Sequence, residues 1–192
     1  MPHIGMSKFK TALLTLGSAL ALSAASSACA ASFEVWNGSS WVNSGSTHFT
    51  GPISISYIGM LLPCNADLGV TISAGTAAVT SWTLSGSTAC AGATAHNLPW
   101  PISVTSYSGP NPPFTGAPLL AGPLYEVSLS GMRFYLPPPM NVYCPSSAGA
   151  AVLKGVIDAD GKLVFKQNVG PCSIQTRATF SLQSSPKVRV VP

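Results

Sequence analysis

Few residues in this chain have side chains suited to acid–base or nucleophilic chemistry. Beyond the first 30 residues they are two histidines and five acidic residues: His48, His96, Glu34, Asp67, Glu126, Asp158 and Asp160. A hydrolytic triad would have to combine His96 with Asp67 and one of the many serines. No nucleophile elbow, zinc-protease helix motif, paired-carboxylate motif or nucleotide-binding glycine loop accompanies them. A polar loop histidine beside Asn97 is the simpler interpretation, so we predict a protein that is not an enzyme and has no cofactor.

The sequence also predicts no metal site. The two histidines sit far apart, and the cysteines are better used in disulfides. The run Asp158-Ala159-Asp160-Gly161 resembles the opening of a calcium loop but lacks the later bidentate glutamate. Because glycine accepts the positive φ of a tight turn, Asp160-Gly161 between two alternating runs predicts a β-hairpin instead.

Four cysteines outside the leader form two similarly spaced pairs. Cys64 and Cys90 lie 26 positions apart, and Cys144 and Cys172 lie 28 apart. Three connectivities are open to four cysteines, and pairing within each half of the chain is the simplest. Free buried thiols are the alternative, which an oxidising compartment disfavours. Closing a loop of about 27 residues stabilises a fold by roughly 3.5 kcal/mol in the chain-entropy model.

The start of the chain has the pattern of a secretory signal. Lys8 and Lys10 precede an apolar run at residues 12–25 and a small-residue stretch that ends at Ala30. We therefore expect a signal peptide at residues 1–30 and a secreted domain, extracellular or periplasmic, at residues 31–192. Lipidation of Cys29 is the alternative, although that signal wants leucine where Ser26 stands. No later segment approaches the roughly 20 apolar residues of a transmembrane helix.

Charge is sparse. Without the leader the chain has seven Lys and Arg against five Asp and Glu, too few and too scattered to bind nucleic acid. Only 7% of all residues are charged while 46% are hydrophobic. This composition is typical of extracellular β proteins whose surfaces meet apolar or polymeric partners. It leaves edge strands without charged residues that oppose aggregation, so self-association is a further expectation.

Alternation of apolar and polar residues, as in Ile53, Ile55 and Tyr57, predicts half-buried strands along the whole secreted part. A proline-rich connector at residues 108–123 divides it into halves at about 31–107 and 124–192. The halves share a layout of strands and cysteines. We therefore predict an all-β fold: an antiparallel β-sandwich with two related halves and a disulfide within each.

Aromatic and apolar side chains are the remaining candidates for a functional surface. A tryptophan platform suits sugar rings, although tryptophans in small β proteins more often pack inside. Trp82 alternates with Leu84 and is expected inside. The connector leucines are candidates for exposed apolar surface, with packing over the sheet as the alternative. The predicted contact surface comprises Trp36, Trp41, Trp100, Leu119 and Leu120.

Short motifs give the chain a resemblance to a known family. They are Gly51-Pro52-Ile53, Leu62-Pro63-Cys64, Asn97-Leu98-Pro99-Trp100 after Cys90, Gly155-Val156 and Gly170-Pro171-Cys172. On these the chain resembles the alkane-oxidation activator (PraB-like) family of small secreted bacterial proteins. The resemblance implies a non-enzymatic extracellular protein associated with growth on hydrocarbons and with cell-surface or biofilm properties. It brings no catalytic residues.

Composition and resemblance together predict a secreted protein that acts at hydrocarbon or cell-surface interfaces. Its partners would be hydrocarbon droplets, cell-surface or matrix components, or further copies of itself. The alternative is an extracellular adhesin, or a carbohydrate- or protein-binding module of the biofilm matrix, which needs an aromatic platform or a pairing edge strand. A secreted hydrolase is the third hypothesis, and it depends on His96.

The disulfide pairing is directly testable. Peptide mapping of the unreduced protein should recover a Cys64–Cys90 peptide and a Cys144–Cys172 peptide. A linked Cys64–Cys144 peptide would contradict the pairing within halves.

Overall fold

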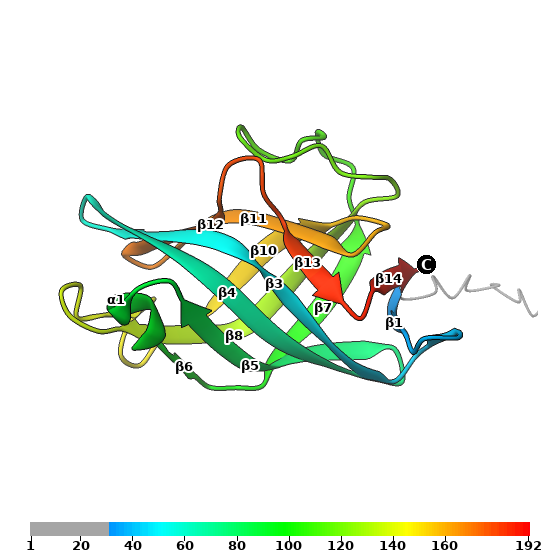
Figure 1. Ribbon diagram of the computed structural model, residues 1–192, viewed down its shortest axis with the longest axis horizontal. Helices are drawn as coiled ribbons and strands as arrows, with labels where there is room; N and C mark the ends of the chain where they lie inside the picture. Colours follow the sequence, from blue (N-terminus) through cyan, green and yellow to red (C-terminus); the bar gives the residue numbers. More distant parts are fainter. Residues whose placement is uncertain (1–30) are drawn as a thin grey trace, which may run out of the picture.

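The computed structural model describes residues 31–192 (Figure 1), so the expected signal peptide and Cys29 lie outside the described part of the chain. Strands dominate this part, and the one helix in it is α1 (Thr88–Ala91). The strands pair antiparallel in their sheets. The prediction of an all-β antiparallel fold is therefore confirmed.

Eight strands follow one another in chain order around a closed sheet, which we call the barrel. The last strand pairs with the first, so that Ile174 lies opposite Ile55. The strands are β3 (Gly45–Tyr57), β4 (Met60–Ser73), β5 (Thr76–Ser85), β7 (Trp100–Ser106), β8 (Tyr125–Leu136), β10 (Ala151–Ile157), β11 (Lys162–Val169) and β12 (Cys172–Thr176). The predicted β-sandwich is wrong in this respect.

The sequence pattern could not distinguish the two architectures. Strands of a sandwich and of a barrel both bury one face, so both show the same alternation. The deciding contact is the pairing of β12 with β3, in which Cys172 faces Tyr57 from 115 positions away. Nothing local in either strand encodes that partner.

Buried and half-buried residues alternate along β8 as expected, except at one β-bulge. Tyr125, Val127 and Leu129 are buried, with half-buried residues between them. An extra residue then enters beside Gly131, whose φ is 80°, where the register with β10 shifts. Because this bulge changes the phase by one residue, Met132 is buried as well.

Both predicted disulfides are confirmed. Cys64–Cys90 and Cys144–Cys172 each have Cα atoms 5.8 Å apart. Cys90 lies in α1, and Cys144 lies in β9 (Val142–Cys144). Each disulfide thus ties an insertion between barrel strands to a strand of the same half. The first half supplies β3, β4, β5 and β7 and the second supplies β8, β10, β11 and β12; a repeat relation between them stays a prediction.

Shorter strands complete the sheet and cover one end of it. β13 (Leu182–Ser185) continues the line of β12 and pairs with β11 and β3. β6 (Thr94–His96) and β9 flank the far part of β8. A separate sheet of β14 (Val188–Val191), β1 (Ser32–Trp36) and β2 (Trp41–Val42) packs against the ends of β3, β4 and β5.

The connector between β7 and β8 folds back onto the outside of the barrel. In Figure 1 it is the green loop at the top of the molecule. Leu120 packs there against Val156 and Val164, with Tyr107 and Phe114 beside them. This is a second apolar cluster, separate from the barrel interior.

Asp158, in the predicted hairpin between β10 and β11, fixes this connector. Its side chain is fully buried and accepts three backbone N–H groups. The donors are Ala121 of the connector at 3.1 Å, Asp160 at 2.9 Å and Lys162 at 2.8 Å. The hairpin prediction is confirmed. The Asp158 carboxylate accepts hydrogen bonds from the backbone of the hairpin and of the connector.

Replacing Asp158 with alanine should destabilise the fold. Three backbone N–H groups would lose a buried, charged acceptor, and we expect the free energy of unfolding to fall by about 3 kcal/mol. Urea denaturation measures this directly. The matched control is Asp160→Ala, which removes an exposed carboxylate 3.6 Å from Lys162 and should change stability by less than about 0.5 kcal/mol. Equal losses in the two variants would contradict the role given to Asp158.

Candidate functional site

The titratable side chains do not gather around His96. Nδ1 of His48 lies 2.7 Å from Oδ1 of Asp67, on the outer wall of the barrel. His96 lies in β6 instead, with its ring centroid 5.6 Å from that of Tyr143. The set of His96 and Asp67 weighed from the sequence therefore does not form.

Ser81 adds a third polar side chain near the His48–Asp67 pair. Strand register puts His48 and Ser81 on either side of Gly69, and a Cβ on that glycine would collide with Ser81 Oγ. Among the described residues no hydrogen bond joins Ser81 to His48, whereas an activated nucleophile needs one. The side chains of His48 and Asp67 are 55% and 45% exposed, so their attraction is worth only about 0–1 kcal/mol. This arrangement is an exposed hydrogen-bonded pair on the barrel surface.

Residues 31–192 contain neither a metal-binding cluster nor a membrane-spanning helix. These residues contain no group of three or more His, Cys, Asp or Glu side chains placed to hold a metal ion. Nor do they form a helix with the length and apolarity needed to cross a membrane.

Two of the four tryptophans lie in the barrel core. Trp82 is buried as expected, with its ring 6.2 Å from that of Trp100. Trp100 has 0% exposure and donates its indole N–H to the carbonyl of His96 at 2.8 Å. Its prediction as a contact residue is wrong, because the first residue of β7 points inward.

The connector leucines differ in exposure. Leu119 is 72% exposed, whereas Leu120 is 4% exposed and cannot be a surface contact, which corrects that prediction. The reason is the Asn111 side chain, which donates to the carbonyl of Leu120 at 2.8 Å and accepts its N–H at 3.0 Å. These two bonds hold Leu120 against the small outer cluster.

Trp36 and Trp41 are half-buried neighbours in the sheet of β1, β2 and β14. Their rings meet edge to face with centroids 5.5 Å apart. The guanidinium of Arg189 lies 4.6 Å from the ring centre of Trp41 and binds the carboxylate of Glu34 at 2.6 Å. Part of each ring is therefore engaged in packing this terminal sheet.

The barrel interior is too full to hold a ligand. Nine apolar side chains, from Phe49 and Leu68 to Ile157 and Leu163, line a cavity of about 20 Å³. That is close to the space of one water molecule, whereas ligand pockets usually measure roughly 300–1,000 Å³. Any contact with a hydrocarbon must therefore be made outside this cavity.

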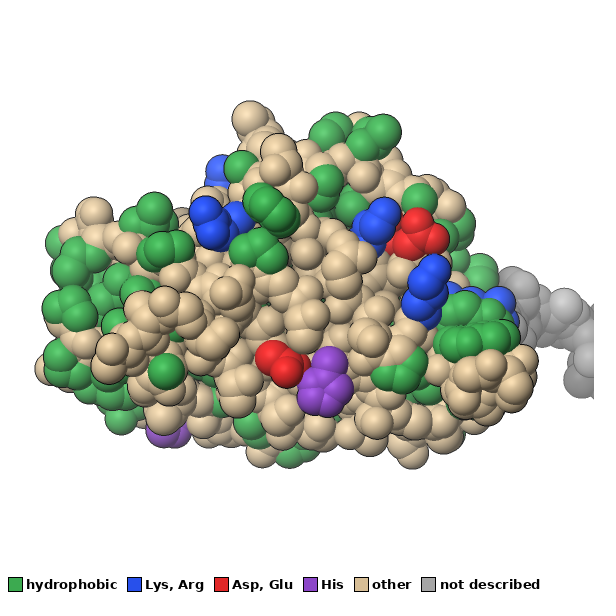
Figure 2. Space-filling model, viewed as in Figure 1, with side chains coloured by type: hydrophobic (Ala, Val, Ile, Leu, Met, Phe, Trp, Pro, Cys, Tyr) green, Lys and Arg blue, Asp and Glu red, His purple; other side chains and the backbone are tan. Residues whose placement is uncertain are grey.

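One end of the barrel is apolar and free of acidic and basic side chains over a connected set of turns. We call it the disulfide end, because both disulfides lie there. Figure 2 shows hydrophobic side chains gathered at the left of the molecule. Arg133, from β8, reaches the border of this end and donates to the carbonyl of Ser147 at 2.8 Å. The disulfide end comprises residues 57–63, 86–92, 137–141, 145–149 and 170–172.

The hairpin between β3 and β4 gives this end its most exposed apolar side chains. Ile58, Met60 and Leu61 are 78%, 38% and 65% exposed. Ile58 is the first residue of the two-residue turn Ile58-Gly59, and Met60 and Leu61 follow the turn, since Tyr57 pairs with Met60. Large apolar residues exposed side by side commonly mark contact surfaces.

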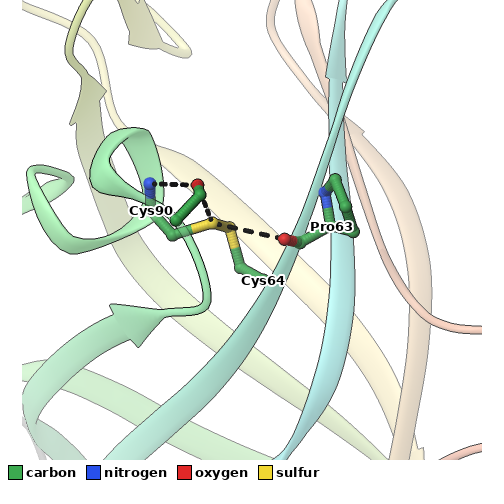
Figure 3. The surroundings of a disulfide bond; sticks show 4 residues. Pro63, Cys64 and Cys90 are labelled. Atoms are coloured by element: carbon green, nitrogen blue, oxygen red, sulfur yellow. Dashed lines mark hydrogen bonds between the residues drawn. A yellow bond between two sulfur atoms is a disulfide. The ribbon is translucent and has the colours of Figure 1, made fainter.

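The Cys64–Cys90 disulfide holds α1 beside this hairpin (Figure 3). Ser87 caps the helix by accepting the N–H of Cys90 at 3.2 Å, which directs the Cys90 side chain toward β4. The sulfur of Cys90 then lies 3.4 Å from the carbonyl oxygen of Pro63. The turn after β5 is thereby fixed to the strand that leaves the apolar tip.

A family model described as alkane oxidation protein activator, PraA/PraB-like, matches residues 6–192. The chain belongs to this family. The resemblance seen in the sequence is thus confirmed, and the family name describes activators of alkane oxidation. Neither a curated protein nor a solved structure matches the chain.

For this PraA/PraB-like chain, sequence reasoning missed both the apolar tip and the His48–Asp67 pair. The run from Tyr57 to Leu62 is apolar apart from one glycine, which was the available signal for the tip. Counting back from the Ile58-Gly59 turn also places His48 diagonally across from Asp67. Both features required the hairpin register.

Iodide quenching of tryptophan fluorescence should separate the two pairs of tryptophans in this PraA/PraB-like protein. Trp82 and Trp100 are 5% and 0% exposed, so a Trp36→Phe/Trp41→Phe double variant should be almost insensitive to iodide. A Trp82→Phe variant, which keeps the outer pair, should remain quenchable. Strong quenching of the double variant would contradict the interior position of Trp100.

Proposed function

We propose that this protein acts without catalysis, outside the cytoplasm, by adsorbing through its disulfide end to the surface of hydrocarbon droplets. It would present the hydrocarbon to the cell rather than transform it. Family membership supports the link to alkane oxidation. Two disulfides support an oxidising compartment, where such bonds persist.

The observation that carries this proposal is the conformation of Ile58. Its φ is 44° and that of Gly59 is 76°, so both central residues of the turn have positive φ. Such two-residue turns favour Asn-Gly, and a β-branched residue at positive φ is a strong outlier. This backbone costs about 1–2 kcal/mol for a residue with a branched side chain. A strained isoleucine that is 78% exposed contributes little to folding, which favours a role for its side chain in contact with something apolar.

The energy available at the tip is sufficient for reversible adsorption. Full transfer of one large aliphatic side chain from water is worth about 1.5–3 kcal/mol. Scaled by their exposed fractions, Ile58, Met60 and Leu61 together offer about 3–5 kcal/mol. With no acidic or basic residue in the turns around them, little charge has to leave water when this end meets an oil surface.

A non-enzymatic role agrees with the placement of the polar side chains. Among the described residues the exposed His48–Asp67 pair has no hydrogen bond to Ser81. His96 lies in β6, opposite Arg133 of β8, and not beside this pair. These arrangements give no support to a hydrolase, so we keep adsorption as the proposed activity.

Replacing Ile58 with asparagine should separate stability from adsorption. Asparagine tolerates positive φ, so thermal unfolding should show a fold stabilised by about 1 kcal/mol. Loss of the aliphatic side chain should lower adsorption about tenfold. Depletion of the oxidised protein from water shaken with hexadecane measures adsorption, with a charge-rich β protein of equal size as the reference.

A matched control lies at the end of the barrel opposite the disulfide end. Ala74-Gly75 forms a turn of the same kind between β4 and β5, with φ values of 49° and 79°. Ala74→Asn should relieve similar strain and leave depletion by hexadecane unchanged. If Ile58→Asn is depleted as strongly as the unchanged protein, adsorption does not use the hairpin tip and the proposal fails.

A further inference from the structure

Three adjoining hollows lie around the connector, on the outside of the barrel. Their volumes are about 180, 370 and 80 Å³, and Phe114 lines all of them. Pro113 is shared by the first two, and Lys166 by the first and the third. We call these three hollows together the Phe114 groove. It is separate from the disulfide end, so a ligand bound there is independent of the proposed adsorption.

Flat apolar surfaces form one part of the groove. Tyr107 and Phe114 are half-buried aromatic residues, and Pro110, Pro112 and Pro113 lie along the same walls. The Tyr107 hydroxyl donates to the carbonyl of Pro110 at 3.1 Å, which fixes the ring against the connector. Rings held in this way are preorganised surfaces that lose little conformational freedom when a ligand covers them.

Charged and polar side chains form the other part. Lys154 and Glu126 make an ion pair of 2.9 Å, so together they add no net charge. Lys166 is exposed, and no ion pair to it is found among the described residues. Gln175 lies directly across the strands from Lys166 and lines the third hollow. The groove therefore combines aromatic faces, amide and carboxylate hydrogen-bonding groups and one unneutralised cation.

These walls disfavour two kinds of occupant, a hydrocarbon and a peptide added as a strand. A hydrocarbon would force Glu126, Lys154 and Lys166 out of water without replacing their hydrogen bonds, which is costly. A peptide added as a strand needs a free sheet edge. β10 and β11 pair with each other at Gly155–Ile157 and with β8 and β12 on their other sides, and the Gln167 side chain bonds the backbone of Val152 and Lys154.

The geometry points to an acidic oligosaccharide as the ligand of the Phe114 groove. A sugar ring has a face of C–H groups that packs on an aromatic ring, and a rim of hydroxyls that reaches amide and carboxylate groups. A uronic acid adds the carboxylate that Lys166 can pair with. The predicted carbohydrate contact thus moves from the tryptophans to Phe114 and Lys166.

Isothermal titration of the oxidised protein with tetragalacturonate tests this assignment, with uncharged cellotetraose as the comparison. We expect saturable binding of tetragalacturonate and at least tenfold weaker binding of cellotetraose. Lys166→Gln should weaken binding of tetragalacturonate about tenfold. Phe114→Leu keeps an apolar side chain in the outer cluster but removes the flat ring, and should weaken binding several-fold without changing the thermal unfolding temperature by more than a few degrees.

Lys187→Gln is the matched control, since it removes the same charge from an exposed lysine beside the terminal sheet. It should leave the affinity within twofold. Three results would overturn the inference: no saturable binding of tetragalacturonate, equal affinity for cellotetraose, or equal weakening by Lys187→Gln and Lys166→Gln. None of them bears on depletion by hexadecane, so the two proposals fail separately.

Discussion

The pairing of β12 with β3 is the constraint on which the rest of this fold depends. It joins the two ends of an eight-stranded antiparallel sheet and leaves no long free edge in the barrel. A chain with only 7% charged residues has few side chains available to protect edges from pairing with other molecules. Closure supplies that protection through the backbone. The low charge that suggested aggregation is therefore compatible with a closed barrel.

Closure of the barrel also limits where a ligand could bind. An eight-stranded barrel has an interior just wide enough for its own side chains, and here the remaining cavity is about 20 Å³. One barrel end is covered by the sheet of β14, β1 and β2, whose Phe33 and Val35 are buried. The other end carries the insertions that the disulfides tie down. Ligand contacts are thus left to the outside of the molecule, where the disulfide end and the outer wall beneath the connector are the two surfaces proposed above.

The sequence predicted the features that depend on local pattern and missed those that depend on distant partners. Alternation identified the strand at Ile53, Ile55 and Tyr57, and cysteine spacing identified both disulfides. Barrel closure was missed because a buried face looks the same whichever strand pairs beside it. Leu120 was misjudged because its orientation depends on Asn111, nine positions away in a segment without periodicity. The exposed tip at Ile58 was missed because only the hairpin register shows that this apolar run turns back on itself.

The two proposed surfaces differ in the forces that would bind their ligands. At the disulfide end the turns hold no acidic or basic residue and the exposed side chains are aliphatic. Binding there would draw on apolar burial and would not weaken as salt screens charges. In the Phe114 groove an acidic ligand would pair with Lys166, so its binding would weaken as salt screens that charge. The connector that lines the groove is held by Asp158 on the flank of the barrel, whereas the tip projects beyond β3 and β4. Because the two surfaces use different elements, the two proposals together would let one molecule hold an oil surface and an acidic polymer at the same time.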